Sequence, residues 1–316
     1  MNKKTKIKLS LSDRIFNAVN IFIMLVIMAV MLAPIIHVVC VSFSLGSEIQ
    51  KGGLFLWPHG FTLEGYKKVL QDHMIVRSYI NTVIYAFSHT ALVIILTALT
   101  AYPLTIKDFP LRKGITIFIT ITMFFSGGAI PTYLLMKELH LINNPLVMVV
   151  PFVVTAYNLI LFRTFFEGID PCMRESARID GAGEFRILIQ IIMPLSKAII
   201  AAVDLIVIST YILSAIIAAV SLFTIVGKWN DWYSALIYLN SEAYYPVQMI
   251  LRKILFNSTV FAQMDPSVMQ MFRNSTITPA NIQMATIVVI MLPIMCIYPF
   301  IQKYFAAGVM VGGVKG

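Results

Sequence analysis

The charged residues in the middle of the chain stand between long apolar runs, over the stretch Glu175-Ser176-Ala177-Arg178-Ile179-Asp180-Gly181-Ala182. Carboxylates and guanidinium groups at this spacing can form directional ion pairs and hydrogen bonds with another protein. In a chain that crosses a bilayer, such groups are expected only where water or a partner receives them. The chemistry that this stretch predicts is therefore docking to a soluble partner.

The residues on either side predict how the stretch is held. Pro171 can begin a helix, and Glu175 places an anion near the first turns of that helix, where the helix dipole favours it. Gly181, directly after Asp180, is the residue type that most readily ends a helix. A second helix is expected over about Glu184 to Met193, before Pro194. We call residues 167–197 the elbow, and small residues are expected to keep it thin enough to enter a groove: Ala177, Gly181, Ala182 and Gly183.

Motifs for catalysis are absent from the sequence. There is no P-loop (G-x-x-x-x-G-K-S/T) and no H-E-x-x-H, C-x-x-C or G-x-S-x-G motif. The three cysteines are far apart and indicate neither a metal site nor a disulfide framework. We therefore expect no catalytic residue, no metal ligand and no cofactor bound by this chain itself.

The composition is that of a membrane protein: 59% of the residues are hydrophobic and only 12% are charged, with a mean hydropathy of +0.83. About 20 helical residues cross a bilayer core, and the runs are continuous, which excludes a β-barrel. The sequence predicts an all-α polytopic protein with six spans, Ile15–Gly46, Ser78–Ile106, Gly114–Met136, Leu139–Phe162, 198–227 and Asn274–Gln302.

The net charge of +9 is distributed in a way that orients the spans. With the N-terminus inside, 15 of the 24 Lys and Arg residues fall on the cytoplasmic side. They are Lys3, Lys4, Lys6, Lys8, Arg14, Lys107, Arg112, Lys113, Arg163, Arg174, Arg178, Arg186, Lys197, Lys303 and Lys315. This positive-inside asymmetry predicts a multi-pass protein of the cell membrane with both termini in the cytoplasm. Membrane lipids, and no nucleic acid, are the expected partners of the basic charge.

Three ionisable residues that could act within the membrane lie well inside the predicted spans: His37, His89 and Asp204. They could form a proton or ion relay, or they could be polar groups satisfied by the bundle or by water near its edge. The fifth span, 198–227, is unusually long and contains the hexapeptide Ala-Ile-Ile-Ala-Ala-Val twice, so that we expect it to bend, protrude or unwind. After Pro246, a mixed apolar and polar pattern predicts a short amphipathic helix.

The elbow resembles the coupling signature of ABC importer permeases, E-A-A-x-x-x-G-x(9)-I-x-L-P. Glu175, Ala177, Gly181, Ile191 and Pro194 are in register with it, while Ser176 and Met193 depart from it. Further stretches look like the carbohydrate-uptake (maltose-type) branch, especially LplC-type permeases. They are Gly127–Tyr133, Asn158–Phe166, Gly227–Trp232 and Gly308–Gly316. The resemblance covers nearly the full chain.

The resemblance implies a permease subunit of an ATP-driven importer of oligosaccharides or related sugars. Its implied partners are a second permease subunit in a heterodimer, a cytoplasmic ATPase dimer that binds the ATP, and an extracellular solute-binding lipoprotein. The chain would comprise a cytoplasmic segment, residues 1–14, and one permease domain, residues 15–316. Coupling to the ATPase is expected from Glu175, Ala177, Asp180, Gly181, Ile191 and Pro194, and sugar contacts from Asn158, Trp229, Asn230 and Trp232.

Two other classes of protein stay open at this stage. An ion-coupled secondary transporter would work without an ATPase under an ion gradient. An intramembrane enzyme or assembly scaffold would need catalytic pairs within the spans, or would tolerate changes in the elbow. The sequence does not identify the solute.

Overall fold

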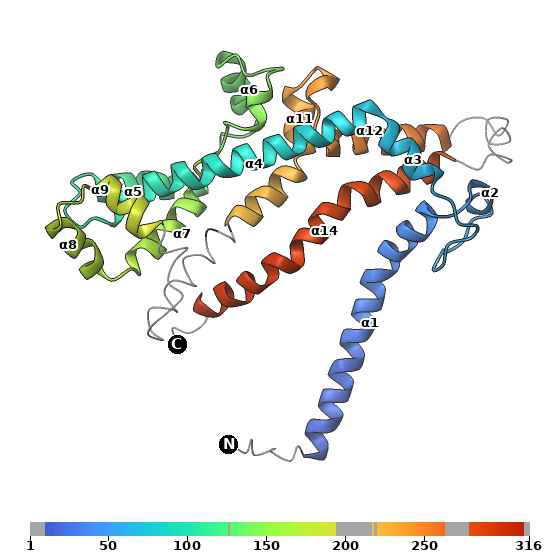
Figure 1. The fold of residues 1–316 in the computed structure, drawn as a ribbon, viewed down its shortest axis with the longest axis horizontal. Helices are drawn as coiled ribbons and strands as arrows, with labels where there is room; N and C mark the ends of the chain where they lie inside the picture. The colour runs from blue at the N-terminus through green and yellow to red at the C-terminus, as the bar shows by residue number, and fades with distance from the viewer. Residues whose placement is uncertain (1–9, 126, 194–216, 218–219, 263–277, 313–316) are drawn as a thin grey trace. The chain divides into compact units, whose positions relative to one another are not determined.

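The computed structural model describes residues 10–125, 127–193, 217, 220–262 and 278–312, and over these ranges the regular elements are helices. A single isolated bridge pairs Ser44 with Phe61. The all-α class is therefore confirmed. The chain divides into two compact units, one drawn from residues 1–72 and 254–290 and the other from residues 73–253 and 291–316. Figure 1 shows the elements of both units.

The first unit is built on the long helix α1 (Leu11–Ser42). The Ser10 side chain accepts from the Asp13 N–H, and the Asp13 carboxylate accepts from the Ser10 N–H, which forms a capping box. The short helices α2 (Gly46–Ile49) and α3 (Glu64–Gln71) follow near the C-terminal end of α1, together with the beginning of α14 (Pro279–Gly312). Most of α1 is exposed, and burial begins only at its last turn.

Asn281 connects these segments. Its side chain is 1% exposed, and Nδ2 donates to the Ser44 carbonyl oxygen at 2.5 Å. The Asn281 Oδ1 accepts from the N–H and the hydroxyl of Thr278, which fixes the first turn of α14. Because a buried amide without partners is costly, these bonds select one position for the loop that follows α1.

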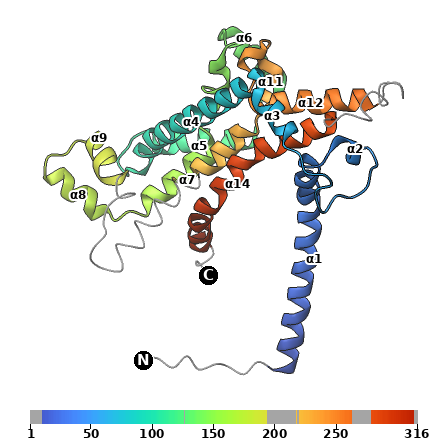
Figure 2. The same cartoon turned by 45° about the vertical axis from the view of Figure 1, so that its right-hand side comes forward.

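The second unit is organised around α4 (His73–Ala101), which packs against α7 (Ala156–Glu167). In Figures 1 and 2, helices α8 (Pro171–Ile179) and α9 (Glu184–Ile187) lie at the C-terminal end of α4, while α6 (Ala129–Glu138) and α11 (Trp232–Tyr238) lie along its N-terminal half. The elbow is thus separated from α11, which contains Trp232, by part of the length of α4.

The third predicted span is not one straight helix. Instead α5 (Arg112–Phe124) and α6 form a pair bent by 119°. The physical reason is the Gly-Gly-x-x-Pro sequence: Gly128 has φ +82°, a conformation that glycine alone adopts without strain, and Pro131 lacks a backbone N–H donor. The predicted span Gly114–Met136 is therefore a bent pair of helices, and its crossing of the membrane as one span stays a prediction.

The fourth predicted span is also interrupted. The 3₁₀ helix η2 (Pro145–Met148) is followed by irregular backbone with Phe152 at φ +60°, and α7 begins only at Ala156. Asn144 and Thr155 cap the two helices with their side chains, accepting from the N–H groups of Leu146 and Asn158. These caps, together with Pro145 and Pro151, interrupt the helix within the predicted span Leu139–Phe162, although the hydropathy is uniform over that span.

The predicted amphipathic helix after Pro246 is present as α12 (Val247–Ala262). Val247, Met249 and Ile250 are buried. The Val247 N–H donates to the Thr82 hydroxyl at 2.8 Å, and the Asn81 amide donates to the Ala243 carbonyl oxygen at 2.9 Å. The 3₁₀ helix η5 (Glu242–Tyr244), which precedes α12, is therefore held against α4.

Three helices in the described part of the chain are long and apolar enough to cross a membrane: α1, residues His73–Thr105, and α14 over Pro279–Cys296. The bent α5/α6 pair would be a fourth if it forms one span. The fifth predicted span lies largely outside the described residues, as do Asp204 and most of the hexapeptide repeat; an apolar helix covers Val220–Trp229.

Candidate functional site

Helix α8, the first half of the elbow, begins at a defined cap. The Asp170 carboxylate accepts from the Cys172 N–H at 2.9 Å, and Pro171 occupies the first helical position. The hydrogen bond from that N–H holds the pKa of the fully exposed Asp170 carboxyl below its ordinary value. The predicted start of the elbow helix at Pro171 is thus present in the structure.

Helix α8 ends in a Schellman motif. The Ala182 N–H donates to the Ala177 carbonyl oxygen at 2.9 Å, and the Gly181 N–H donates to the Arg178 carbonyl oxygen at 3.0 Å. Gly181 has φ +79°, in the left-handed region. A Cβ added to Gly181 would meet no atom of the described residues within 4 Å. Glycine is therefore favoured here by its backbone conformation, and not by crowding from the described part of the chain.

The second half of the elbow is helical, as predicted, but it is not uniform. Helix α9 covers one turn and continues as a π-helical segment, η3 (Leu188–Ile192). Ile187, Leu188 and Ile192 are each at most 3% exposed. π-Helical turns occur often at functional sites, because the extra residue in the turn redirects the side chains that follow.

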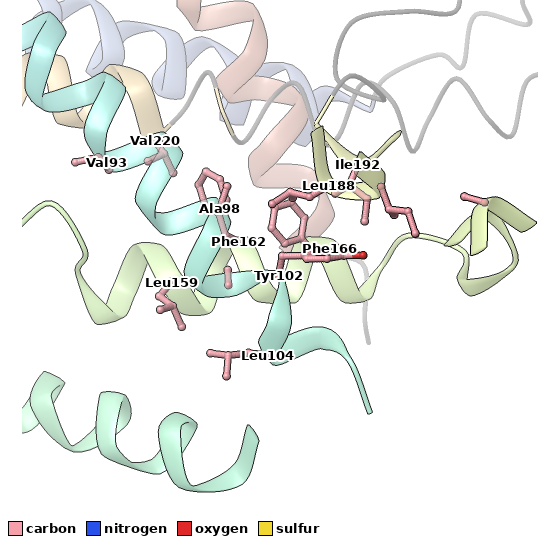
Figure 3. Close-up of a cluster of buried hydrophobic side chains, with 13 residues drawn as sticks. Val93, Ala98, Tyr102, Leu104, Leu159, Phe162, Phe166, Leu188, Ile192 and Val220 are labelled. Carbon is pink, nitrogen blue, oxygen red and sulfur yellow. The ribbon is translucent and has the colours of Figure 1, made fainter. Parts of the chain in front are cut away.

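The buried side of the elbow packs on α4 and α7 in one hydrophobic cluster, shown in Figure 3. Tyr102 and Phe166 meet edge to face at 6.4 Å, and Phe162 and Phe166 at 5.8 Å between ring centroids. Burying a side chain such as Leu188 contributes about 1.5–3 kcal/mol. The elbow is therefore a continuation of the core of the second unit and not a free loop.

Glu184 connects the elbow to the end of α4. One carboxylate oxygen accepts from the Tyr102 hydroxyl at 2.6 Å, and the other accepts from the Arg178 Nε at 2.6 Å. We call these three residues the Glu184 bridge. Partial burial by itself would raise the pKa of the Glu184 carboxyl, but the hydrogen bonds from Tyr102 and Arg178 outweigh it and hold the pKa below 4.5.

The predicted coupling residues divide into an outer and an inner group. Glu175, Asp180 and Gly181 are exposed. Ala177 is only 7% exposed and packs in the hydrophobic cluster, as does the half-buried Ile191. The space around Ala177 is thus filled by its own chain, and its expected part in keeping the elbow thin stays a prediction. Pro194 lies outside the described residues.

Sequence reasoning missed two apolar residues on the outer side of the elbow. Ile179 is 87% exposed and Phe185 is 66% exposed, on either side of the Gly181 turn. Large apolar side chains beside charged ones on an otherwise polar segment indicate a surface that a protein partner covers. The available signal was their position in the sequence, on either side of the predicted Asp180–Ala182 turn.

The four candidate sugar contacts are not equivalent. Trp229 is 4% exposed and packs edge-on against Tyr79 at 5.4 Å, so its main role is packing. Trp232 is 38% exposed, and the Arg252 guanidinium lies 4.4 Å from its ring centroid. The Asn230 side-chain oxygen accepts from Gln248 at 2.9 Å. Both contacts are with α12, whereas Asn158 lies in the first turn of α7.

The two in-span histidines have structural partners. The Phe55 N–H donates to His37 Nδ1 at 3.0 Å. The His89 Nδ1 lies 2.7 Å from the Val149 carbonyl oxygen, and because a carbonyl can only accept, the imidazole nitrogen donates. These contacts favour polar groups satisfied within the fold over an ion relay for both residues.

Comparisons with known proteins agree with this arrangement. No protein-family model matches the chain. The chain is 32% identical over 305 residues to the protein LplC of Bacillus subtilis, with 96% of each chain covered. It is 33% identical to the polygalacturonan/rhamnogalacturonan transport system permease protein YtcP of the same organism, covering 97% of this chain and 100% of that one.

One solved structure matches in fold and in sequence. It is a chain of a bacterial ABC transporter involved in the import of the acidic polysaccharide alginate, with a TM-score of 0.82 and 29% identity. The match covers 95% of the present chain and 100% of the other. These similarities, together with the helical fold and the elbow packed on its core, show that this chain is a permease subunit of an ABC importer. The chain belongs to the carbohydrate ABC transporter permeases of the LplC type.

Proposed function

We propose that this permease couples ATP binding and hydrolysis by a separate ATPase to the passage of an oligosaccharide, and that the elbow transmits the movement. The single observation that supports this most is the two-sided elbow. Its inner side is continuous with the hydrophobic cluster on α4 and α7, and its outer side exposes Glu175, Asp180, Ile179 and Phe185. Such an element can be pushed from outside and move the helices behind it as one body.

The elbow would work between two states of the membrane bundle. Closure of the ATPase dimer displaces the elbow, and the Glu184 bridge carries the displacement to the end of α4. The bundle then changes which side of the membrane the solute path opens to, and hydrolysis resets it. The closed ATPase dimer must bind one state of the bundle more tightly than the other, because this difference in binding free energy drives the change.

The finer assignments are part of the same proposal. The chain has six crossings in the cell membrane with both termini in the cytoplasm, and it catalyses no reaction and holds no cofactor of its own. It pairs with a second permease subunit, two ATPase subunits and an extracellular lipid-anchored binding protein. The positive-inside charge distribution and the similarity to an ABC importer support these assignments.

We propose acidic oligosaccharides as the solute class. The similar chains include one named for polygalacturonan and rhamnogalacturonan, and one from a transporter of the acidic polysaccharide alginate. In this chain Arg252 above the Trp232 ring offers a cation for a carboxylate next to an aromatic face for a sugar ring. Replacement of Arg252 by Gln is expected to reduce uptake of a uronate oligomer more than uptake of a neutral one of equal length.

The test is a reconstitution of the chain with its ATPase and its second permease in proteoliposomes. ATP should drive accumulation of a labelled oligosaccharide that the binding protein delivers, and omission of the ATPase should abolish it. Accumulation by the chain alone under an ion gradient would support the ion-coupled secondary transporter instead and would refute the proposal.

A further inference from the structure

Two adjoining hollows at the elbow end of the second unit are lined by cations that the coupling proposal does not use. One, of about 290 Å³, lies between η1 (Pro103–Thr105), α5, α7 and the beginning of α8; the other, of about 680 Å³, lies along the first turns of α5. We call them together the basic cleft. Its cations are Lys107, Arg112, Lys113, Arg163 and Arg174.

The acidic residues of the cleft do not balance these charges. Asp108, Glu167 and Asp170 also line it, so five cations face three anions and two positive charges are left over. One oxygen of Glu167 accepts from both Arg112, at 2.8 Å, and Arg163, at 3.0 Å. Asp170 already accepts from the backbone at the start of α8. The electrostatics of the cleft therefore favour an added anion.

Further hydrogen-bond donors line the two hollows. Within the described part of the chain, the Nε of Arg174, which lines the smaller hollow, is buried and has no hydrogen-bond partner. Among the same residues, no side chain caps the first turn of α5, where Arg112 and Lys113 line the larger hollow. Open N–H groups at a helix N-terminus, together with a buried unpaired guanidinium nitrogen, are suited to the oxygens of a phosphate group.

The apolar surroundings indicate where the rest of the ligand lies. Helix α5 has no buried residue, and Ile117 and Phe118 on it are 61% and 69% exposed. Ile117 also lines the basic cleft. An acidic protein surface would not need this apolar continuation, whereas a phospholipid does. We propose that the basic cleft binds the phosphate of an anionic membrane phospholipid, with the acyl chains along α5.

The proposal can be tested by measuring lipid binding to the full chain, purified with the subunits that accompany it. The sample is delipidated, incubated with equal amounts of phosphatidylglycerol and phosphatidylcholine, and the retained lipid is quantified by mass spectrometry. We expect a preference for phosphatidylglycerol. The variants Lys107→Gln and Lys113→Gln, alone and combined with Arg174→Gln, should weaken this preference by roughly fivefold for each cation removed.

A matched variant controls for the loss of charge as such. Replacement of Lys67, Lys68 and Lys137 by Gln removes three cations elsewhere on the chain and should leave the preference unchanged. An unchanged preference in the cleft variants, with an unchanged Tm, would overturn the proposal. So would inorganic phosphate that displaces the lipid at equal concentration, which indicates a site for free phosphate, or loss of ATPase subunits without loss of lipid, which indicates a protein-docking surface. Because the readout is binding, failure of the coupling proposal would not affect it.

Discussion

At Gly181 the backbone conformation restricts which residues fit, whereas the surrounding space does not. A loss of function on substitution can therefore come from backbone strain or from the added side chain, and the two can be separated. The φ of +79° excludes β-branched residues at a cost of about 1–2 kcal/mol, while asparagine tolerates this region well. Among the described residues, no atom lies within 4 Å of a Cβ at this position. We therefore propose that intolerance of bulk here comes from a partner.

We predict that Gly181→Asn preserves the turn and the Tm but lowers sugar uptake for each ATP hydrolysed, since its side chain enters the space that the ATPase is proposed to fill. Gly181→Val should lower both the Tm and uptake, because it also strains the turn. Both are measured in proteoliposomes with the ATPase present. Normal uptake by the Asn variant would contradict a tight contact at this residue.

The Glu184 bridge allows a second prediction at the residue scale. Glu184→Gln and Tyr102→Phe each remove part of the link between the elbow and α4. Each should lower uptake more than ATP hydrolysis, and the double variant should be little worse than either single one, because the two groups act through one contact. Glu138→Gln, on exposed α6, serves as the control. Additive losses in the double variant would refute a shared role.

The pH dependence of this effect follows from the pKa of Glu184. Because hydrogen bonds hold that pKa below the ordinary value of a glutamate, the carboxylate contributes fully above that ordinary value, and its contribution is lost only as the pH falls through the lowered pKa. The difference in uptake between wild type and Glu184→Gln should therefore stay constant between about pH 6 and 8. A difference that grows or vanishes in this range would show that another group titrates at the bridge.

At the scale of elements, the elbow is held by its inner side. Leu188 is 3% exposed, whereas its neighbour Ile189 is 47% exposed. We predict that Leu188→Ala lowers the free energy of unfolding by about 2–5 kcal/mol and releases the elbow from α4 and α7, while Ile189→Ala costs much less. Thermal unfolding of both variants checks this. Equal destabilisation would mean that the elbow does not depend on the cluster.

The helices that sequence reasoning predicted correctly have strong local signals. Pro171 with Asp170 before it, the Gly181 stop, and the pattern after Pro246 each act within one or two turns. The two predicted spans in which the structure shows interruptions were judged by hydropathy, which is nearly uniform over Gly114–Met136 and Leu139–Phe162. In these two spans the path of the backbone is set by Gly128 and by caps such as Asn144 and Thr155. Hydropathy averaged over some twenty residues does not detect such single residues.

For the site, sequence reasoning found the exposed charges but not their contacts. Glu184 and Tyr102 are 82 positions apart, and only the packing of the elbow on α4 brings them together. Likewise, nothing in the local sequence distinguishes the buried Ala177 from a surface alanine. Contacts between distant segments depend on the tertiary arrangement, which periodicity and spacing do not report.

At the scale of the whole molecule, the elbow lies at the C-terminal end of α4, whereas α11 and η5 lie along its N-terminal half. If α4 carries the displacement, a change at one end should be felt at the other. We predict that Glu184→Gln alters the protection of the η5 amides against hydrogen exchange when ATP is bound to the ATPase, although η5 is far from the substitution. Equal protection with and without the bridge would indicate that movement travels by another route.

The inward position of Ala177 has a consequence for exchanging subunits between related transporters. Residues that contact only their own chain can stay fixed when the energy-supplying subunit is replaced by one from another species, whereas Ile179 and Phe185 face whatever is placed against them. Adapting this permease to a foreign subunit should thus require changes at the outward pair and none at Ala177. In natural families, a larger residue at position 177 should occur together with a smaller one at Ile187 or Tyr102, its neighbours in the cluster.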